Sequence, residues 1–319
     1  MNWKVSISVV VFGVLCTGQS FSADRQAYHF HIYRLTRVEI LSTNVPSART
    51  FYEKTLNVHK DCTLCEKLPV APIILNAQQA LLISKAPAPL SSNLISEIIF
   101  STDNVRELRR YLKEQKIQIV EPDENENRAE RYLSVIDPEG HHIGFAQNVG
   151  VPNPSDPAQP LAALSSSVQL IHAGFIVRDR AATEHFYKDI LGFRPYWHGG
   201  MKDDQTDWVS VQVPDGTDWL EFMVNVEPDA DQKLRGIMNH IAIGVTDIHA
   251  TQRKLLDAGV KLTEEPQIGR DGKWQLNLYD PDVTRVEFME FTPVQKPCCS
   301  EFTGPHPGPQ SSSKAPAKP

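Results

Sequence analysis

The chain has 319 residues, of which 41% are hydrophobic and 22% charged, and its formal net charge is -7 at pH 7. This length is enough for about two domains with a core in each, and the composition is typical of a soluble globular protein. The acidic balance argues against a nucleic-acid-binding surface, so we expect no nucleic-acid partner.

Residues 1–23 have the pattern of a signal peptide. A short basic start at Met1 to Lys4 is followed by an apolar run at residues 5–15 and by small residues up to Ala23. The apolar run is shorter than the roughly 20 residues of a membrane span, although an uncleaved N-terminal anchor is the alternative. We therefore expect a secreted or periplasmic protein that has no membrane contact after cleavage.

Residues 34–148 form the first predicted folded unit. Its apolar residues follow the order strand, helix, strand twice, with the last two strands on either side of the turn Asp137-Pro138-Glu139-Gly140. This half is therefore predicted to be a doubled module. The expected elements are strands at residues 35–45, 73–83, 95–100, 132–136 and 142–146, and helices at residues 47–56 and 105–115.

Residues 149–167 are rich in proline and small residues, which predicts a linker. The second unit, residues 168–292, repeats the order of elements of the first, with Asp179 and Asp247 as predicted N-caps of its two helices. Residues 293–319 contain too few apolar residues to fold alone, so we expect a disordered tail.

Beyond Cys16, the cysteines are Cys62 and Cys65, in a CxxC motif, and the adjacent Cys298 and Cys299. They suit an oxidising compartment without requiring disulfides. A zinc ribbon would need a second CxxC, so we expect the first pair to be a loop disulfide or free thiols rather than a redox or metal site.

An internal repeat in the second unit carries two histidines and two carboxylates. The pattern His-x4-Val-x-Asp begins at His172 and again at His240, and a strand-like segment with a glutamate follows each, at Glu221 and Glu287. An inward imidazole or carboxylate on a buried strand is costly unless it is paired or coordinated. A lone strand histidine is more often a hydrogen-bonded residue, but four such residues at repeated spacing favour one divalent ion: Zn, Ni, Co, Mn or Fe(II).

The first half has not kept these four residues. The halves align through Phe51-Tyr52 with Phe186-Tyr187 and through Asp137-Pro138 with Asp280-Pro281. We therefore expect one metal site per chain, in the second half. In this alignment His172, Glu221, His240 and Glu287 face Arg37, Leu82, Glu97 and Gly144.

The second half resembles the vicinal oxygen chelate superfamily, which includes glyoxalase I, extradiol dioxygenases, methylmalonyl-CoA epimerase, and the fosfomycin and bleomycin resistance proteins. The resemblance rests on the two His-x4-Val-x-Asp openings, on Phe186-Tyr187 followed by Leu191-Gly192-Phe193, and on Asp280-Pro281-Asp282 leading to Glu287. It covers residues 170–291 and, as a degenerate copy, residues 35–147.

This resemblance implies an α+β fold of two tandem domains, each of paired βαβββ modules whose sheets curl around a cavity. It implies that His172, Glu221, His240 and Glu287 are the metal ligands. Val283 departs from the family, which usually has glycine after Asp-Pro-Asp, so we expect a turn of different shape there.

Among known activities the ligand set is most similar to that of glyoxalase I, in which a metal-bound carboxylate moves a proton next to a carbonyl. Glu221 or Glu287 would then be the catalytic base, acting on a small oxygenated substrate as a lyase or isomerase. The glutathione adduct that glyoxalase I uses does not suit a secreted protein, so the chemistry and the compartment disagree.

Two alternatives stay open. An extradiol ring-cleaving dioxygenase uses two histidines and one carboxylate, and Glu221 would occupy a position that such an enzyme leaves open. A non-catalytic small-molecule-binding protein of the bleomycin resistance type needs no metal ligands. The site closes within one chain or between two, so a homodimer is possible. Four tryptophans could line an aromatic pocket or serve ordinary packing: Trp197, Trp208, Trp219 and Trp274.

Overall fold

The computed structural model describes most of the two predicted units. The described residues are 28–58, 72–88, 93–120, 131–147, 168–227 and 229–309, together with the backbone of residues 152–153 and 156–160. The predicted signal peptide and the pair Cys62 and Cys65 lie outside them. In this part of the chain, no helix is long and apolar enough to cross a membrane.

The first half forms a mixed sheet of seven strands, in the order β2-β3-β1-β4-β7-β6-β5. β1 and β4 pair antiparallel at its centre, while β3 and β7 run parallel to them on either side. The elements are β1 (Ile32–Ser42), α1 (Val45–Thr55), β2 (Ile73–Asn76), β3 (Gln79–Lys85), β4 (Ile95–Thr102), α2 (Val105–Glu114), β5 (Ile119–Val120), β6 (Tyr132–Ile136) and β7 (His142–Gln147).

The second half repeats this plan in an eight-stranded sheet, ordered β11-β12-β13-β10-β14-β17-β16-β15. β10 and β14 are its central antiparallel pair. The elements are β10 (Gln169–Ile176), α3 (Arg180–Glu184) continued by the π-helical turn η3 (His185–Ile190), β11 (Arg194–Gly199), β12 (Trp208–Gln212), β13 (Trp219–Met223), α4 (Gln232–Met238), β14 (His240–Val245), α5 (Ile248–Asp257), β15 (Gln267–Ile268), β16 (Trp274–Tyr279) and β17 (Arg285–Glu290).

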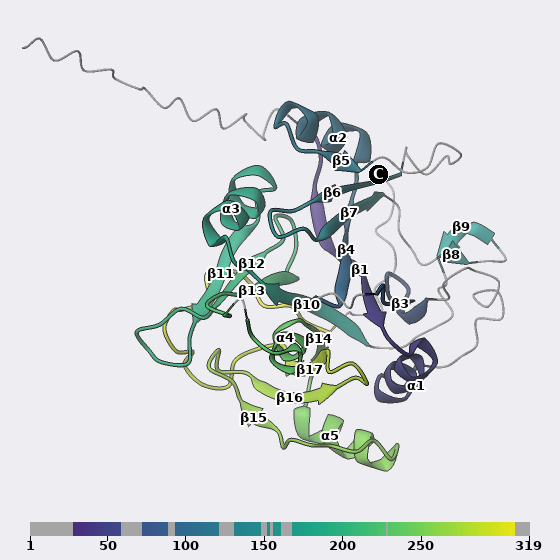
Figure 1. The fold of residues 1–319 in the computed structure, drawn as a ribbon, viewed down its shortest axis with the longest axis vertical. Coiled ribbons are helices and arrows are strands. Elements are labelled where there is room, and N and C mark those ends of the chain that lie inside the picture. Colours follow the sequence, from purple (N-terminus) through teal and green to yellow (C-terminus); the bar gives the residue numbers. More distant parts are fainter. Residues whose placement is uncertain are drawn as a thin grey trace, which may run out of the picture.

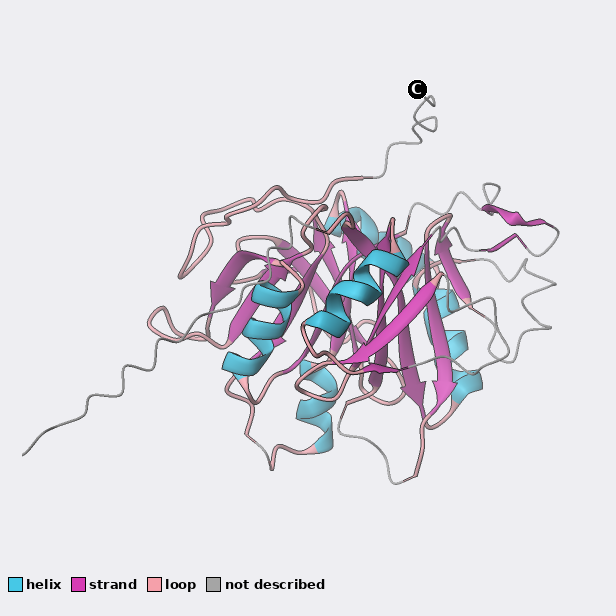
Figure 2. Ribbon diagram, turned by 90° about the horizontal axis from the view of Figure 1, so that it is seen from above, coloured by secondary structure: helices cyan, strands magenta, loops and turns pink. Residues whose placement is uncertain are grey.

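These two sheets confirm the predicted α+β class with doubled modules (Figure 1). The strands occupy the middle of the molecule and the helices flank them (Figure 2). The predicted linker contains a small two-stranded sheet of β8 (Pro152–Asn153) and β9 (Asp156–Pro160).

Both predicted N-caps are confirmed. The side chain of Asp179 accepts a hydrogen bond from the backbone of Ala182 at 2.9 Å, and that of Asp247 accepts one from Ala250 at 2.8 Å. Each carboxylate therefore satisfies a backbone N–H that the first helical turn leaves free. In the first half, asparagine does the same work at Asn44.

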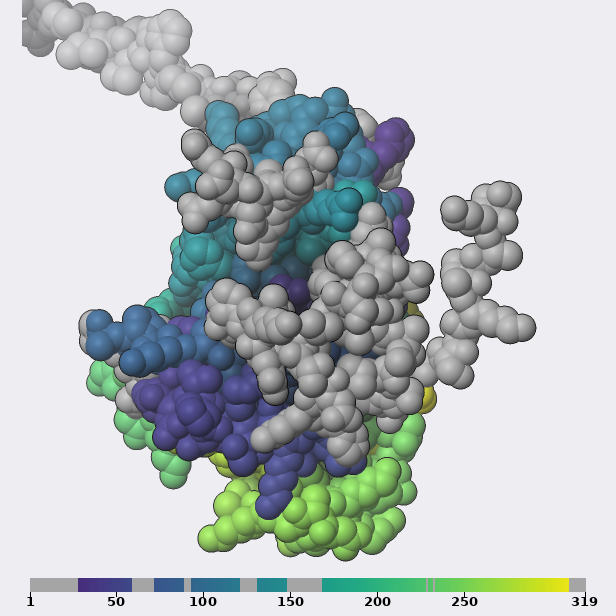
Figure 3. Space-filling view, turned by 90° about the vertical axis from the view of Figure 1, so that its right-hand side faces the viewer, coloured from purple at the N-terminus to yellow at the C-terminus, as the bar shows by residue number. Residues whose placement is uncertain are grey.

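The two halves share one hydrophobic core rather than two separate ones. Gln79, which is 1% exposed, joins the central strands of the two sheets. Its amide nitrogen donates to the carbonyl oxygens of Leu35 on β1 and Leu170 on β10, both at 2.7 Å. Figure 3 shows the purple surface of the α1 region against the green surface of α5, where Lys54 Nζ donates to the carbonyl of Gly259 at 2.7 Å.

A reciprocal pair of contacts also holds the halves together. The hydroxyl of Tyr52 donates to Asp280 Oδ2 at 3.1 Å, and the hydroxyl of Tyr187 donates to Asp137 Oδ2 at 2.9 Å. Each aspartate begins the turn before the last strand of its own half, and each tyrosine lies on the first helical segment of the other half. The halves are thus related by an approximate twofold arrangement.

The Asp280 turn has the same shape as the Asp137 turn, so the expected difference in shape is wrong. Val283 has φ 71°, in the left-handed region, and Gly140 has φ 90° at the matching position. In each turn the residue at this position donates its backbone N–H to the carbonyl of the opening aspartate, at 2.9 Å for Val283 and 3.0 Å for Gly140. The β-branched residue adopts a conformation that suits glycine because the surrounding hydrogen bonds impose it.

The expectation of a disordered tail is wrong for residues 293–309, which run back over the second sheet. Phe302 packs on Tyr196 with ring centroids 4.9 Å apart, and Thr303 donates its backbone N–H to the carbonyl of Tyr196 at 3.0 Å. Cys298 and Cys299 form a disulfide with each other. The segment does not fold alone but gains its stability from aromatic surface on β11.

Candidate metal centre

The strand register brings the four predicted residues to one face of the second sheet. Gly174 on β10 pairs with Glu221 on β13 and with His240 on β14. Ala242, two residues along β14, pairs with both His172 and Glu287. Residues paired across neighbouring strands, or two apart along one strand, share a face. Four adjacent strands therefore each present one of the four side chains to the same side.

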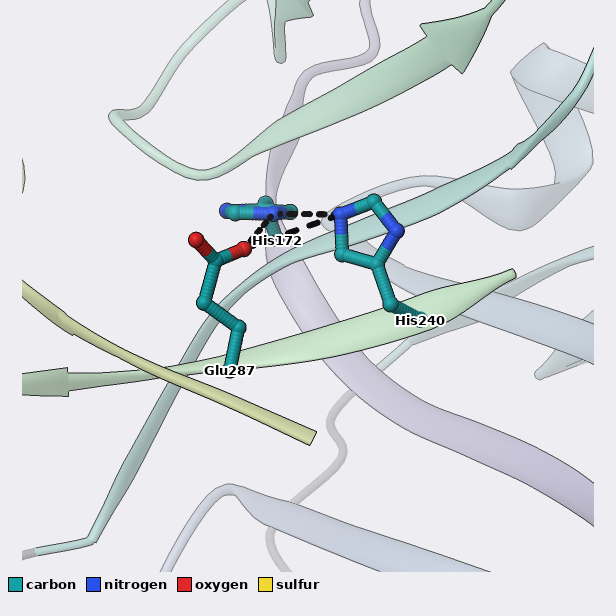
Figure 4. Close-up of side chains that lie close together, drawn as sticks. All are labelled: His172, His240 and Glu287. Atoms are coloured by element: carbon teal, nitrogen blue, oxygen red, sulfur yellow. Dashed lines mark hydrogen bonds and ion pairs between the residues drawn. The ribbon is translucent and has the colours of Figure 1, made fainter. Parts of the chain in front are cut away.

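Three of these side chains converge on one point (Figure 4). His172 Nε2 lies 3.0 Å from His240 Nε2 and 3.5 Å from Glu287 Oε2, and His240 Nε2 lies 3.8 Å from the same oxygen. All three residues are buried, with exposures of 0%, 0% and 2%. One ligand atom from each lies within 4.8 Å of the others, which is the spacing of donors that share an ion.

Glu221 lies at the edge of this cluster. Its Oε2 is 3.2 Å from His240 Nε2, and its Oε1 is 3.4 Å from the hydroxyl of Ser210. Its side chain is 15% exposed, which is more than that of the other three residues. The structure therefore brings all four predicted residues together, with Glu221 on the open side.

Gly174 makes room for the imidazole of His240. A Cβ atom at this position would lie 1.9 Å from His240 Cε1 and 2.5 Å from both ring nitrogens. Any residue other than glycine would displace the ring. The sequence pattern alone does not identify this role of Gly174.

The protonation states favour coordination. The Nδ1 atom of His240 faces the carbonyl of Met238 at 3.1 Å and so carries the proton, which leaves the Nε2 lone pair for the cluster. Burial and the charge of Arg285 lower the pKa of His240, so its ring is neutral at pH 7. Burial alone would raise the pKa of Glu287, but Arg285 and His172 outweigh it and lower the pKa to about 2.

Burial also opposes ionisation of Glu221, yet the interaction with His240 lowers the pKa of this carboxyl below its usual value. A neutral imidazole at His240 beside ionised carboxylates at Glu221 and Glu287 is the form in which these side chains bind a metal ion. The residues present therefore fit a divalent ion, as the donor types predict.

A cavity of about 330 Å³ opens beside the cluster. Glu221 and Glu287 line it, together with Trp197, Trp208 and Trp219. The fourth tryptophan, Trp274, does not line this cavity but packs against His249, with ring centroids 4.8 Å apart. Of the two alternatives left open, lining a pocket therefore applies to three of the four tryptophans and ordinary packing to Trp274.

The matching face of the first sheet has different chemistry. Its pairings align Arg37, Leu82, Glu97 and Gly144 with the four residues of the second sheet, as the sequence alignment predicts. Glu97 accepts a hydrogen bond from the hydroxyl of Tyr132, and burial raises the pKa of its carboxyl. Among the described residues of this half, no group of side chains has metal-binding spacing.

Two other histidines of the second half lie outside the cluster. His185 Nδ1 contacts Asp189 at 2.9 Å, and the backbone of His198 donates to Ser300 at 2.9 Å. A further group, Asp203 with Cys298 and Cys299, has metal-binding spacing, but its cysteines are bonded to each other.

Comparison with known proteins agrees with this geometry. Residues 169–288 match the family described as the Glyoxalase/Bleomycin resistance protein/Dioxygenase superfamily. The chain is 28% identical over 125 residues to a lactoylglutathione lyase of Haemophilus influenzae, a match that covers 39% of this chain and 93% of that protein.

Solved structures of two-domain dioxygenases share the fold of both halves. Homoprotocatechuate 2,3-dioxygenase from Arthrobacter globiformis has a TM-score of 0.58 and 18% identity, and the match covers 82% of this chain and 80% of that chain. A catechol 2,3-dioxygenase has a TM-score of 0.60 and 16% identity, covering 89% and 97%. At these identities the likeness shows the fold and not the reaction.

The fold, the His–His–Glu cluster and the match of residues 169–288 to the family model support the vicinal oxygen chelate superfamily for the second half of the chain. The second half of the chain belongs to the superfamily of glyoxalases, bleomycin resistance proteins and dioxygenases. This confirms the resemblance drawn from the sequence motifs. Enzymes of this superfamily use a metal ion, and His172, His240 and Glu287 could bind one in this chain.

Proposed function

We propose that the protein is a metal-dependent isomerase or lyase in which Glu221 moves a proton next to a carbonyl group of a small oxygenated substrate. The observation that carries this proposal is the position of Glu221. Its carboxylate is ionised, touches the His172–His240–Glu287 cluster through His240, and lines the cavity in which a substrate would lie.

In this proposal His172, His240 and Glu287 hold a divalent ion, with Glu221 beside them. The bound ion would supply Lewis acidity toward a carbonyl or enediolate oxygen. Glu221 takes the proton from the carbon next to the carbonyl and returns it to the neighbouring carbon, so that no atom is gained or lost overall. The rings of Trp197, Trp208 and Trp219 line the cavity and would pack against the substrate.

The test is Glu221→Gln, which keeps the shape of the side chain but removes the base. We expect weaker metal binding and a loss of turnover, measured as proton exchange with D2O by NMR on hemithioacetals of small 2-oxoaldehydes. Glu97→Gln is the control, because this partly buried carboxyl lies on the matching face of the first sheet, at the place that aligns with His240. A Glu221→Gln protein with full metal content and full exchange activity would contradict the proposal.

A ring-cleaving dioxygenase is the second candidate, because the three converging residues are two histidines and one carboxylate. The two-domain dioxygenase structures support it through the shared fold of both halves. Oxygen uptake with catechols by the iron-loaded protein, retained in Glu221→Gln, would favour this candidate over proton transfer. Secretion and the choice of metal stay predictions.

A further inference from the structure

Lys273 is a buried lysine that directly precedes β16. The proposed mechanism assigns it no role. Its side chain is 0% exposed, and among the described residues its Nζ atom has no hydrogen-bond partner. It also lines the cavity that contains Glu221 and Glu287. Burying an ammonium group without a hydrogen-bond partner is unfavourable, so its presence here calls for an explanation.

Three aromatic rings surround this ammonium. Nζ lies 4.5 Å from the ring centroid of Trp219, 4.9 Å from that of Phe302 and 5.6 Å from that of Tyr196. Cation–π contacts of this kind stabilise the charge, but they supply no hydrogen-bond acceptor. Among the described residues, the three N–H bonds of the ammonium therefore stay unsatisfied.

The nearest carboxylate in sequence does not supply the missing partner. Asp271 Oδ1 accepts from the backbone N–H of Lys273 itself at 3.1 Å and from the side-chain amide of Gln275 at 3.2 Å. Within the described part of the chain, no ion pair joins Lys273 to Asp271 or to any other carboxylate. Burial lowers the pKa of Lys273 and raises that of Asp271, which reflects the cost of keeping either group charged at this depth.

We propose that Lys273 binds the carboxylate of an acidic substrate whose other end lies at the His172–His240–Glu287 cluster. This inference rests on the proposed function, because it names the substrate class of the same cavity. Lys273 and the three rings around its ammonium all line the cavity, and Nζ has almost no accessible surface, so a carboxylate reaches it from the cavity when one of these rings turns aside. A single ammonium with three donors suits a carboxylate, whereas a phosphate dianion would need further donors around it.

The aromatic walls indicate what the carboxylate is attached to. Trp219 lies between the two ends of the site: its ring contacts the ring of His172, with centroids 4.5 Å apart, and it also faces Lys273. A flat or apolar body between a carboxylate and an oxygenated carbon would pack on this ring. The substrate class is therefore a small aromatic or apolar carboxylic acid whose oxygenated carbon lies at the far end from the carboxylate.

Isothermal titration calorimetry on the metal-free full chain tests this inference, with mandelate and mandelamide as probes that differ in charge but hardly in size. We expect mandelate to bind at least about tenfold more tightly than mandelamide, which corresponds to about 1.4 kcal/mol. The preference should disappear in Lys273→Met, which keeps the bulk of the side chain, and persist in the control Lys261→Met, an exposed lysine.

Equal affinities for the two probes in the unaltered protein would overturn the proposal, and so would a preference that survives in Lys273→Met. Tighter binding of inorganic phosphate than of mandelate would overturn the assignment to a carboxylate. If Lys273→Met does not fold, the comparison of the two probes on the unaltered protein decides alone. Because the titration needs neither metal nor turnover, its result is independent of whether Glu221 acts as the base.

Discussion

Gly174→Ala should disrupt the proposed metal site without changing any of the proposed ligands. The added methyl group would lie 1.9 Å from Cε1 of His240, whereas ordinary contact begins at 3.4 Å, so the imidazole must move by roughly 1.5 Å. The ring is 0% exposed and its Nδ1 atom is held by the carbonyl of Met238, so a shift of this size breaks that contact. Nε2 then leaves the position from which it faces His172 and Glu287.

We expect the metal affinity to fall by roughly 100-fold or more, which corresponds to about 3 kcal/mol. Misplacing a ligand costs at least as much affinity as removing the hydrogen bond that orients that ligand. Overpacking should also lower the free energy of unfolding of the metal-free protein by about 1–3 kcal/mol. Equilibrium dialysis against zinc followed by elemental analysis measures the first effect, and urea denaturation after chelation measures the second. Gly308→Ala is the control, because its Cβ would meet nothing within 4 Å.

A double variant separates the steric cause from a general effect on the strand. In a His240→Ala background the ring is gone, so adding Gly174→Ala should cost almost no further stability. An equal loss of stability in both backgrounds would mean that the methyl group does not clash with His240. Unchanged zinc affinity in the single variant would refute the claim that His240 binds metal with its ring in this orientation.

Two further substitutions test the backbone and the buried charges. Val283→Gly should raise the free energy of unfolding, measured by urea denaturation, by about 1 kcal/mol. The backbone angle φ of 71° costs a β-branched residue about 1–2 kcal/mol, and the extra chain entropy of glycine in the unfolded state offsets roughly 0.5–1 kcal/mol of that gain. An unchanged denaturation midpoint would contradict this prediction. Asp218→Asn should stabilise the protein by roughly 4 kcal/mol at pH 8 and by less than about half as much at pH 5, because burial raises the pKa of this carboxyl from 3.8 to about 7. The folded state therefore binds this proton more tightly than the unfolded state, so the wild-type protein loses stability as the pH rises from about 4 to 7. If the stability gained by Asp218→Asn did not vary with pH, this account would be refuted. Asparagine keeps the oxygen that accepts the backbone N–H of Leu35 at 2.9 Å.

The central strands and the four clustered residues could be predicted because their signals are local and repeated. Strand periodicity places alternate residues on one face, and the His-x4-Val-x-Asp pattern marks equivalent strands in the two modules. Once β10, β13, β14 and β17 lie side by side, the register brings His172, Glu221, His240 and Glu287 together without further information.

The tail and the supporting residues could not be predicted in the same way. Phe302 is an isolated aromatic residue in a proline-rich stretch, and its packing partner Tyr196 is distant in the sequence. The need for glycine at Gly174 depends on a ring that arrives from a neighbouring strand. The role proposed for Lys273 depends on three rings from three separate segments. None of these contacts leaves a periodic pattern in the residues that make it.

The approximate twofold arrangement explains why a first half without metal ligands still matters to the site. Asp280 opens the turn that leads into β17, the strand that carries Glu287, and its buried carboxyl is held by Tyr52 from the first half. In the same turn Asp282 accepts the backbone N–H of Thr43 at 3.0 Å, next to the start of α1. The left-handed conformation of Val283 is therefore fixed from outside its own half. The first half thus lacks residues that would bind a metal on the matching face but supplies those that position the last strand of the second half.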